Sequence, residues 1–206
     1  MSTGSASAHD CILLAAGPST RMGRPKQIEP VHGIPLFLYA LRTALGSCSR
    51  VIVVEGAVSL SPHLSPHLPA SLRADERVVV VGNEQYRRGQ LGSLQVGLRH
   101  RRTPAAFIML ADLPLVVPGT YDAVAKAVGP DDAAAYPVHA GRRGHPVWIG
   151  APAIELLLSA PPERRALEVI APLNPREVEV ADPGIYLDAD TPEALGAIAA
   201  RVRRGR

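Results

Sequence analysis

Four short apolar runs that alternate with helical patterns constrain the fold of this chain more than any other feature. The runs occupy residues 11–15, 51–55, 78–82 and 106–110. Runs of this length and composition are typical of strands that are buried on both faces of a sheet. Apolar residues at helical spacing lie between the runs, for example Leu38, Leu41 and Leu45. Strands that alternate with helices predict an α/β fold, namely a Rossmann-like, mostly parallel sheet with helices on both faces.

Proline and glycine positions refine this prediction. Pro35 is expected in the first turn of the first helix, a second helix near Gly92, and a third helix opening at Pro118. The later elements are expected to be strands over residues 133–138 and 146–149, a strand near Val178, and a final helix opened by Asp190, Thr191 and Pro192. These positions predict that strands and helices alternate along the whole chain.

Length and composition predict one domain. The chain has 206 residues, of which 47% are hydrophobic and 20% are charged, as in an ordinary globular protein with a sizeable core. Residues 1–9 are small and polar and are expected to form a flexible tail, which leaves a single domain over residues 10–206. The N-terminus lacks an apolar h-region, and no apolar run approaches the roughly 20 residues that span a bilayer. We therefore expect a cytoplasmic protein with no membrane partner.

Charge and cysteine content exclude other classes. The net charge is only +3, and much of the basic excess lies at the C-terminus, at Arg201, Arg203, Arg204 and Arg206. Because no RNA-binding signature accompanies these arginines, we expect no nucleic-acid partner. Cys11 and Cys48 have neither the number of a disulfide framework nor a metal-ligand spacing, and they are expected to be inert thiols.

The segment after the first apolar run carries the strongest functional signal. Small residues at positions 15–17 permit close approach of backbone N–H groups to a nucleotide, and Arg21 and Lys26 then supply positive charge for phosphates. The segment is neither a P-loop nor the Gly-x-Gly-x-x-Gly of dinucleotide-binding proteins. The alternative is a surface loop that is merely basic and rich in glycine.

Asp112 is the first candidate metal ligand. It follows the apolar run 106–110 and is expected at the carboxyl end of a central strand, where open α/β sheets bind their ligands. Mg²⁺ takes one or two protein carboxylates together with substrate phosphates and water, so one or two such aspartates suffice. The alternative is that Asp112 caps the turn at Leu113 and Pro114.

Four segments together resemble one family, the MobA-like nucleotidyltransferases. They are residues 13–26, 89–94, 111–115 and 187–193, and the resemblance covers nearly the whole chain. Within the family the chain looks most like the molybdopterin cytidylyltransferase branch. The Leu-Ala-Ala-Gly at residues 14–17 and the Gly-Arg-Arg-Gly-His-Pro at residues 141–146 carry this closer resemblance.

The resemblance implies a fold of the nucleotide-diphospho-sugar transferase type and an Mg²⁺-dependent transfer reaction. A nucleotidyl group, CMP from CTP in the favoured reading, would pass to molybdopterin or another phosphorylated acceptor, with release of pyrophosphate. Catalytic roles are implied for Arg21, Lys26 and Asp112. The implied nucleotide-binding residues are Leu14, Ala15, Ala16, Gly17, Arg21, Lys26, Gly89 and Ser93. The implied metal ligands are Asp112 and Asp190, and the implied acceptor-binding residues are Gly144, His145 and Pro146.

Several of these residues also have plain structural readings. Asp190 precedes Thr191 and Pro192 and is a suitable helix N-cap, and Asp188 is a substitute metal ligand. The glycines around Ser93 lie at an expected helix entrance, which favours an anion, or they form an ordinary glycine-rich loop. His145 is equally well a surface residue in a β-turn.

One departure from the family pattern lies on the acceptor side. Where the family has Gly-Asp-x-Gly-Ala-Arg, residues 159–166 read Ser-Ala-Pro-Pro-Glu-Arg-Arg-Ala. This leaves the acceptor open, and a guanylyltransferase or an enzyme for another phosphorylated metabolite is an alternative. A different class is an NAD(P)H-dependent dye oxidoreductase resembling nicotine blue oxidoreductase, although no dinucleotide fingerprint is present. A third is a non-catalytic chaperone that hands cofactor to a molybdoenzyme partner.

Overall fold

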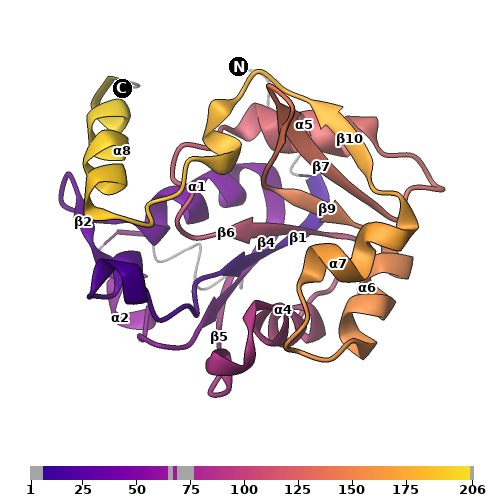
Figure 1. Ribbon diagram of the computed structural model, residues 1–206, viewed down its shortest axis with the longest axis horizontal. Helices are drawn as coiled ribbons and strands as arrows, with labels where there is room; N and C mark the ends of the chain where they lie inside the picture. Colours follow the sequence, from indigo (N-terminus) through magenta and orange to yellow (C-terminus); the bar gives the residue numbers. More distant parts are fainter. Residues whose placement is uncertain (1–6, 65–66, 69–76, 205–206) are drawn as a thin grey trace.

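A single eight-stranded mixed sheet organises the computed structural model, which describes residues 7–64, 67–68 and 77–204 (Figure 1). Its strands are β1 (Ser7–Leu14), β4 (Cys48–Glu55), β5 (Val78–Gly82), β6 (Ala106–Leu110), β7 (Ala134–His139), β8 (Arg142–Arg143), β9 (Val147–Ile149) and β10 (Arg176–Glu179). The order is β10-β7-β9-β6-β1-β4-β5, and β8 pairs with β7. Strands β6, β1, β4 and β5 run parallel, as do β7 and β10, whereas β9 is antiparallel to both of its neighbours. The predicted mostly parallel α/β fold is confirmed.

Helices cover both faces of the sheet (Figure 1). They are α1 (Phe37–Ser47), α2 (Ser61–Leu64), α4 (Gln90–Arg99), α5 (Pro118–Ala127), α6 (Ala151–Ser159), α7 (Ala166–Ile170) and α8 (Pro192–Arg204). Alternate residues of a strand point to opposite faces. Cys11 and Leu13 of β1 accordingly pack with α1 and α5, while Ile12 packs with α4 and α6. Figure 1 shows α4, α6 and α7 on the side opposite α1 and α5.

A glycine brings α4 unusually close to the central strands. A Cβ atom built on Gly97 would lie only 2.9 Å from Cγ2 of Val54 and would also collide with Ile12. The sheet therefore meets the helix backbone directly at this point, near the C-terminal end of α4.

A third, smaller core holds the C-terminal helix. Val31 and Leu36, on either side of the hairpin formed by β2 (Pro30–Val31) and β3 (Ile34–Pro35), pack with Ala189 and Ile198. In Figure 1 helix α8 stands beside this hairpin, away from the other helices. The segment that leads into α8 is thereby anchored next to the loop that follows β1.

Three element boundaries differ from the sequence prediction. Pro35 does not open α1, because it pairs with Pro30 in the hairpin and the helix begins at Phe37. The second helix begins at Gln90, two residues before the expected Gly92. Ser7 and His9, assigned to a flexible tail, belong to β1, where the His9 ring packs edge-on against Phe107. The sequence analysis missed this part of the strand because several of its residues are polar. No helix in the described ranges is long and apolar enough to cross a membrane.

Candidate nucleotide and metal site

A cavity of about 650 Å³ opens at the carboxyl ends of β1 and β6. These two strands pair side by side, with Leu14 opposite Leu110, so the loops that follow them lie next to each other. The cavity is lined by most of the residues implied in nucleotide and metal binding, namely Leu14, Ala15, Ala16, Gly17, Lys26, Gly89, Ser93, Asp112 and Asp190. Its size suits a small-molecule ligand. Its position is the one at which open α/β sheets bind ligands.

Hydrogen bonds to one buried side chain, that of Gln27, fix the loop that follows β1. The Gln27 amide donates hydrogen bonds to the carbonyl oxygens of Ala15 (3.1 Å) and Gly17 (2.6 Å). Its own oxygen accepts a hydrogen bond from the Ser19 hydroxyl at 3.0 Å, and that hydroxyl in turn accepts the Lys26 backbone N–H at 3.1 Å. Both ends of the loop are thus tied to one residue, which leaves Lys26 directed into the cavity.

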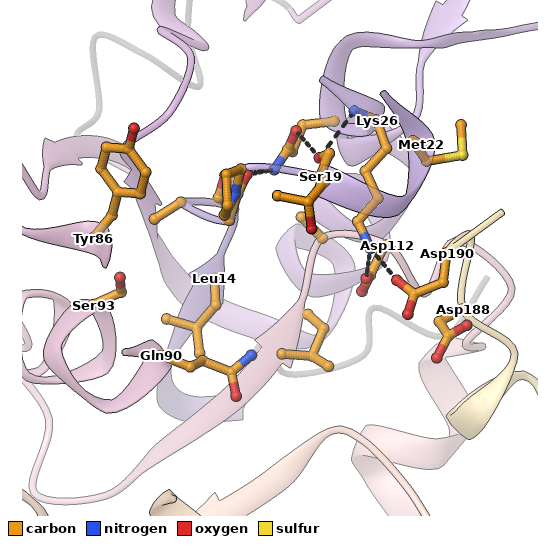
Figure 2. A pocket seen from close by; sticks show the side chains of 18 of the residues that line it. Leu14, Ser19, Met22, Lys26, Tyr86, Gln90, Ser93, Asp112, Asp188 and Asp190 are labelled. Carbon is orange, nitrogen blue, oxygen red and sulfur yellow. Dashed lines mark hydrogen bonds and ion pairs between the residues drawn. The ribbon is translucent and has the colours of Figure 1, made fainter. Parts of the chain in front are cut away.

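Lys26 lies between the two candidate metal ligands (Figure 2). Its Nζ atom is 2.5 Å from Oδ2 of Asp112 and 2.5 Å from Oδ1 of Asp190, and the lysine side chain is only 13% exposed. Burial alone would lower the pKa of Lys26, but the charges and hydrogen bonds of Asp112 and Asp190 outweigh it and raise the pKa above its ordinary value. The ammonium group therefore stays charged and occupies the position of a cation between two carboxylates.

The two aspartates meet although 77 residues separate them in sequence. Asp112 follows β6, and its carbonyl oxygen accepts a hydrogen bond from the Ala189 N–H at 3.0 Å. Ala189 is buried in the small core beneath α8, so the preceding and following residues, Asp188 and Asp190, are presented at the cavity. In Figure 2 Asp188 lies beside Asp190 on the same wall.

The carboxylates fit a hard divalent cation. Oδ1 of Asp112 is buried and has no hydrogen-bond partner among the described residues, which is costly for a charged group unless something binds there. Within the same residues no group of three or more ligating side chains converges. Two carboxylates without further protein ligands are the arrangement that suits Mg²⁺, whose remaining ligands are phosphate oxygens and water.

The opposite wall of the cavity comes from the turn before α4. Gly89 has φ 139° and ψ 162°, a conformation essentially restricted to glycine, and it directs Gln90 and Ser93 toward the cavity. The Ser93 hydroxyl accepts a hydrogen bond of 2.9 Å from the Asn83 amide and is buried. This wall also carries Arg87, which adds a positive charge, and in Figure 2 Gln90 and Ser93 lie across the cavity from Lys26 and the aspartates.

A second cavity of about 380 Å³ adjoins the first, and the two share Leu14 and Gln90 as lining residues. Gly144 and His145 line the second cavity, whereas Pro146 is buried and lines neither. Burial lowers the pKa of His145 to about 4, against an opposing effect of the Asp112 charge, so this histidine is neutral at neutral pH. It is held in place by its backbone N–H, which donates to the Ile185 carbonyl at 2.9 Å.

The structure thus gathers the sequence candidates into two adjoining groups. The side chain of Arg21 lies outside the described residues, although its backbone belongs to a 3-10 turn over Thr20–Met22. Gln27 was missed by the sequence analysis, because a side chain that ties a loop together leaves no pattern in the sequence. Gln90 was also missed as an individual residue, although it follows Gly89 in one of the four family-like segments.

Fold and cavity together define an α/β protein of the nucleotidyltransferase class. The chain belongs to the family of the MobA-like NTP transferase domain, whose model matches residues 11–180. The molybdenum cofactor cytidylyltransferase of Escherichia coli strain K12 is 28% identical over 188 residues, which are 91% of this chain and 93% of that protein. A probable molybdenum cofactor guanylyltransferase of Chloroflexus aggregans is 34% identical over 118 residues, 56% of this chain and 51% of that protein.

Solved structures support the same fold. The homologue of Mycobacterium tuberculosis Rv0371c from Mycobacterium sp. strain JC1 superimposes with a TM-score of 0.76 at 22% identity, covering 96% of this chain and 98% of that one. A manganese complex of Rv0371c from M. tuberculosis H37Rv gives a TM-score of 0.71 at 24% identity, covering 94% and 99%. These likenesses confirm the fold, and one of the proteins that share it has been crystallised with manganese.

Proposed function

We propose that this protein transfers a nucleotidyl group from CTP to molybdopterin or the molybdenum cofactor, with release of pyrophosphate. The observation that carries the proposal is the placement of Lys26 between Asp112 and Asp190, in a cavity that continues into a second one. The Leu-Ala-Ala-Gly segment at residues 14–17 and the E. coli cytidylyltransferase relative support CTP as donor and molybdopterin as acceptor.

Charge balance supports a divalent metal cofactor, for which we propose Mg²⁺. One ammonium and the three carboxylates of Asp112, Asp188 and Asp190 give this wall a formal net charge of −2, and a nucleoside triphosphate adds several negative charges. Asp112 and Asp190 would hold the metal, which when bound neutralises phosphate charge and polarises the phosphorus that is attacked. The manganese complex of Rv0371c is consistent with a divalent ion in a protein of this fold.

The protein's own groups then position the reactants. An oxygen of the acceptor phosphate attacks the α-phosphorus, the bond to the bridging oxygen breaks, and pyrophosphate leaves. Lys26 exchanges its carboxylate partners for phosphate oxygens, together with Arg21, and stabilises the leaving group. The acceptor phosphate is already anionic and requires no general base. Ala15, Gly17 and the Gly89 turn enclose the nucleoside, so orientation and charge neutralisation account for the rate.

Pyrophosphate release tests the proposal directly. We expect release with CTP, Mg²⁺ and molybdopterin, no release without the metal, and slower release with GTP or ATP. CTP should also raise the unfolding temperature most in the presence of Mg²⁺, because a ligand at 100 times its Kd adds about 2.7 kcal/mol of stability. Nucleotide binding without pyrophosphate release would instead indicate a non-catalytic chaperone, and oxidation of NAD(P)H would indicate an oxidoreductase.

A guanylyltransferase is the second candidate, favoured by the resemblance to the probable guanylyltransferase of C. aggregans. The same panel separates the two, since equal or greater stabilisation and turnover with GTP would assign the chain to the guanylyl branch.

A further inference from the structure

The loop over residues 159–166 forms one rim of the second cavity. Four of the lining residues come from this loop, namely Glu163, Arg164, Arg165 and Ala166, and the loop is where the chain departs from the family pattern. The departure therefore lies on a cavity wall and not at a remote surface, and its chemistry bears on what that cavity binds.

The loop packs on the turn before α4, which lines the first cavity, here called the nucleotide cavity after its proposed ligand. The Arg88 guanidinium donates two hydrogen bonds, of 3.0 and 2.8 Å, to Oε1 of Glu163. Gly89 allows this contact, because a Cβ atom there would lie 2.6 Å from the Pro162 carbonyl oxygen. The Gln95 amide holds the start of the loop by donating to the Ala160 carbonyl at 2.7 Å. These contacts give the loop a defined position over the cavity.

The charges around the cavity cancel except at one residue. Glu163 is engaged by Arg88, and Arg143 is paired with Glu177 at 2.8 Å. Arg165 lies 4.0 Å from Glu168. Arg164 differs, since among the described residues its guanidinium makes no hydrogen bond or ion pair, while its backbone N–H donates to the Pro161 carbonyl at 3.1 Å. One uncompensated cation is therefore held at the rim.

The floor beneath this cation is apolar. It is formed by the side chains of Leu14, Leu94, Ile108, Val147 and Ile170, with the ring of Tyr136 beside them. His145, which also lines the cavity, adds no charge. A cavity of this size and polarity suits the flat or aliphatic body of a small molecule, and a guanidinium at its rim suits a phosphate or carboxylate.

We propose that Arg164 binds an anionic group of the acceptor, whose ring-shaped or apolar body rests on this floor. The term acceptor rests on the proposed function, but the binding itself does not require transfer. The loop 159–166 thus determines acceptor specificity in this chain through Arg164.

Binding of a model compound tests this inference without the reaction. We would titrate 1-naphthyl phosphate, and 1-naphthol as its uncharged counterpart, into the full-length protein by calorimetry in the absence of metal and nucleotide. Arg164→Gln should weaken the phosphate about fivefold, as expected for a partly exposed ion pair, and should leave naphthol binding unchanged. Arg164→Lys keeps the charge and should lose less.

Arg99→Gln is the matched control. Arg99 lies at the end of α4, is exposed, and lines neither cavity, so its replacement removes the same charge elsewhere. The inference is overturned if wild type does not bind the phosphate at millimolar concentration, if Arg164→Gln changes its affinity less than about twofold, or if Arg99→Gln causes an equal loss.

The transfer reaction gives a separate readout. With molybdopterin as acceptor, Arg164→Gln should raise the acceptor KM and leave the KM for CTP and the kcat nearly unchanged. Failure of pyrophosphate release by wild type would refute the proposed function alone, because the calorimetric result on Arg164 stands independently of it. A raised KM for CTP in the variant would contradict the assignment of Arg164 to the acceptor side.

Discussion

The two adjoining cavities are built from different parts of the sheet. The nucleotide cavity lies at the ends of the parallel strands β1 and β6 and carries a lysine and two aspartates in contact. The second cavity lies over the antiparallel strands β7 and β9 and the loop between α6 and α7, and its floor is apolar. The charged groups thus lie at the centre of the fold, whereas the proposed recognition of the acceptor lies in a peripheral loop.

The largest effect should come from the charged wall. Asp112→Asn is nearly isosteric and keeps one oxygen, but it removes the charge that is proposed to bind Mg²⁺. We expect pyrophosphate release to fall at least about 100-fold, because charge neutralisation by a metal is worth several kcal/mol in the transition state. The loss should exceed that of Asp190→Asn, whose duty Asp188 can share. If Asp112→Asn releases pyrophosphate within about threefold of the wild-type rate at saturating metal and donor, the metal-binding role is contradicted and Asp112 is a turn-forming residue.

Lys26→Met should separate nucleotide binding from metal binding. Loss of a charged hydrogen bond to phosphate costs about 2 kcal/mol, so CTP affinity should fall about thirtyfold. In the absence of nucleotide the same change removes the competing ammonium group from Asp112 and Asp190, so Mn²⁺ alone should bind more tightly than to wild type. Calorimetry with each ligand measures both effects. Weaker Mn²⁺ binding would show that Lys26 supports the carboxylates and does not compete for them.

Gly89→Ala should disturb the wall of the first cavity and, through the contact with Pro162, the loop beside the second cavity. The glycine-only backbone conformation and the contact with the Pro162 carbonyl predict a loss of about 1–3 kcal/mol in the free energy of unfolding. Gly119→Ala is the control, because a Cβ atom there meets nothing within 4 Å. Chemical denaturation measures both variants. Equal stability of the two would mean that the turn accommodates a side chain by shifting.

The smallest effect concerns the uncharged histidine of the second cavity. Because the folded pKa of His145, about 4, lies below the ordinary value of 6.5, the unfolded state takes up its proton first as the pH falls. The contribution of His145 to the free energy of unfolding is therefore fully present above pH 6.5, and it is lost as the pH falls from 6.5 to about 4.

His145→Asn should remove this pH dependence. Between pH 7 and pH 5 the free energy of unfolding should fall by about 1 kcal/mol more in wild type than in the variant, allowing for solvent screening. His63→Asn, at a histidine that lines neither cavity, should behave like wild type. Identical pH profiles for wild type and His145→Asn would contradict a buried, neutral histidine.

The sequence predicted the parts of the molecule that depend on local pattern. Continuous apolar runs gave the central strands, and the position of Asp112 after one of them followed from the rule that ligands bind at strand ends. The structure brings Lys26, Asp112 and Asp190 into contact, while their roles stay predictions. The family resemblance supplied Asp190, because no local signal distinguishes a metal ligand from a helix cap.

Contacts between distant segments could not be predicted. The hairpin that takes up Pro35 depends on pairing with Pro30, and the role of Gln27 depends on carbonyl oxygens that turn toward it only in the folded loop. The contrast between Arg164 and Arg165 is invisible in sequence, since it arises from the neighbours that each guanidinium meets. Propensity and periodicity describe a segment, whereas these features belong to pairs of segments.

The hydrogen bond from Ala189 to the Asp112 carbonyl has a consequence for the order of synthesis. Every strand of the sheet precedes residue 180, so the sheet can assemble as the chain leaves the ribosome, whereas Asp190 arrives only with the segment leading into α8. A nascent or truncated chain that ends at β10 would have a nearly complete core but only one of the two aspartates at Lys26. The proposed metal site is therefore completed only by the C-terminal segment, after the last strand of the sheet.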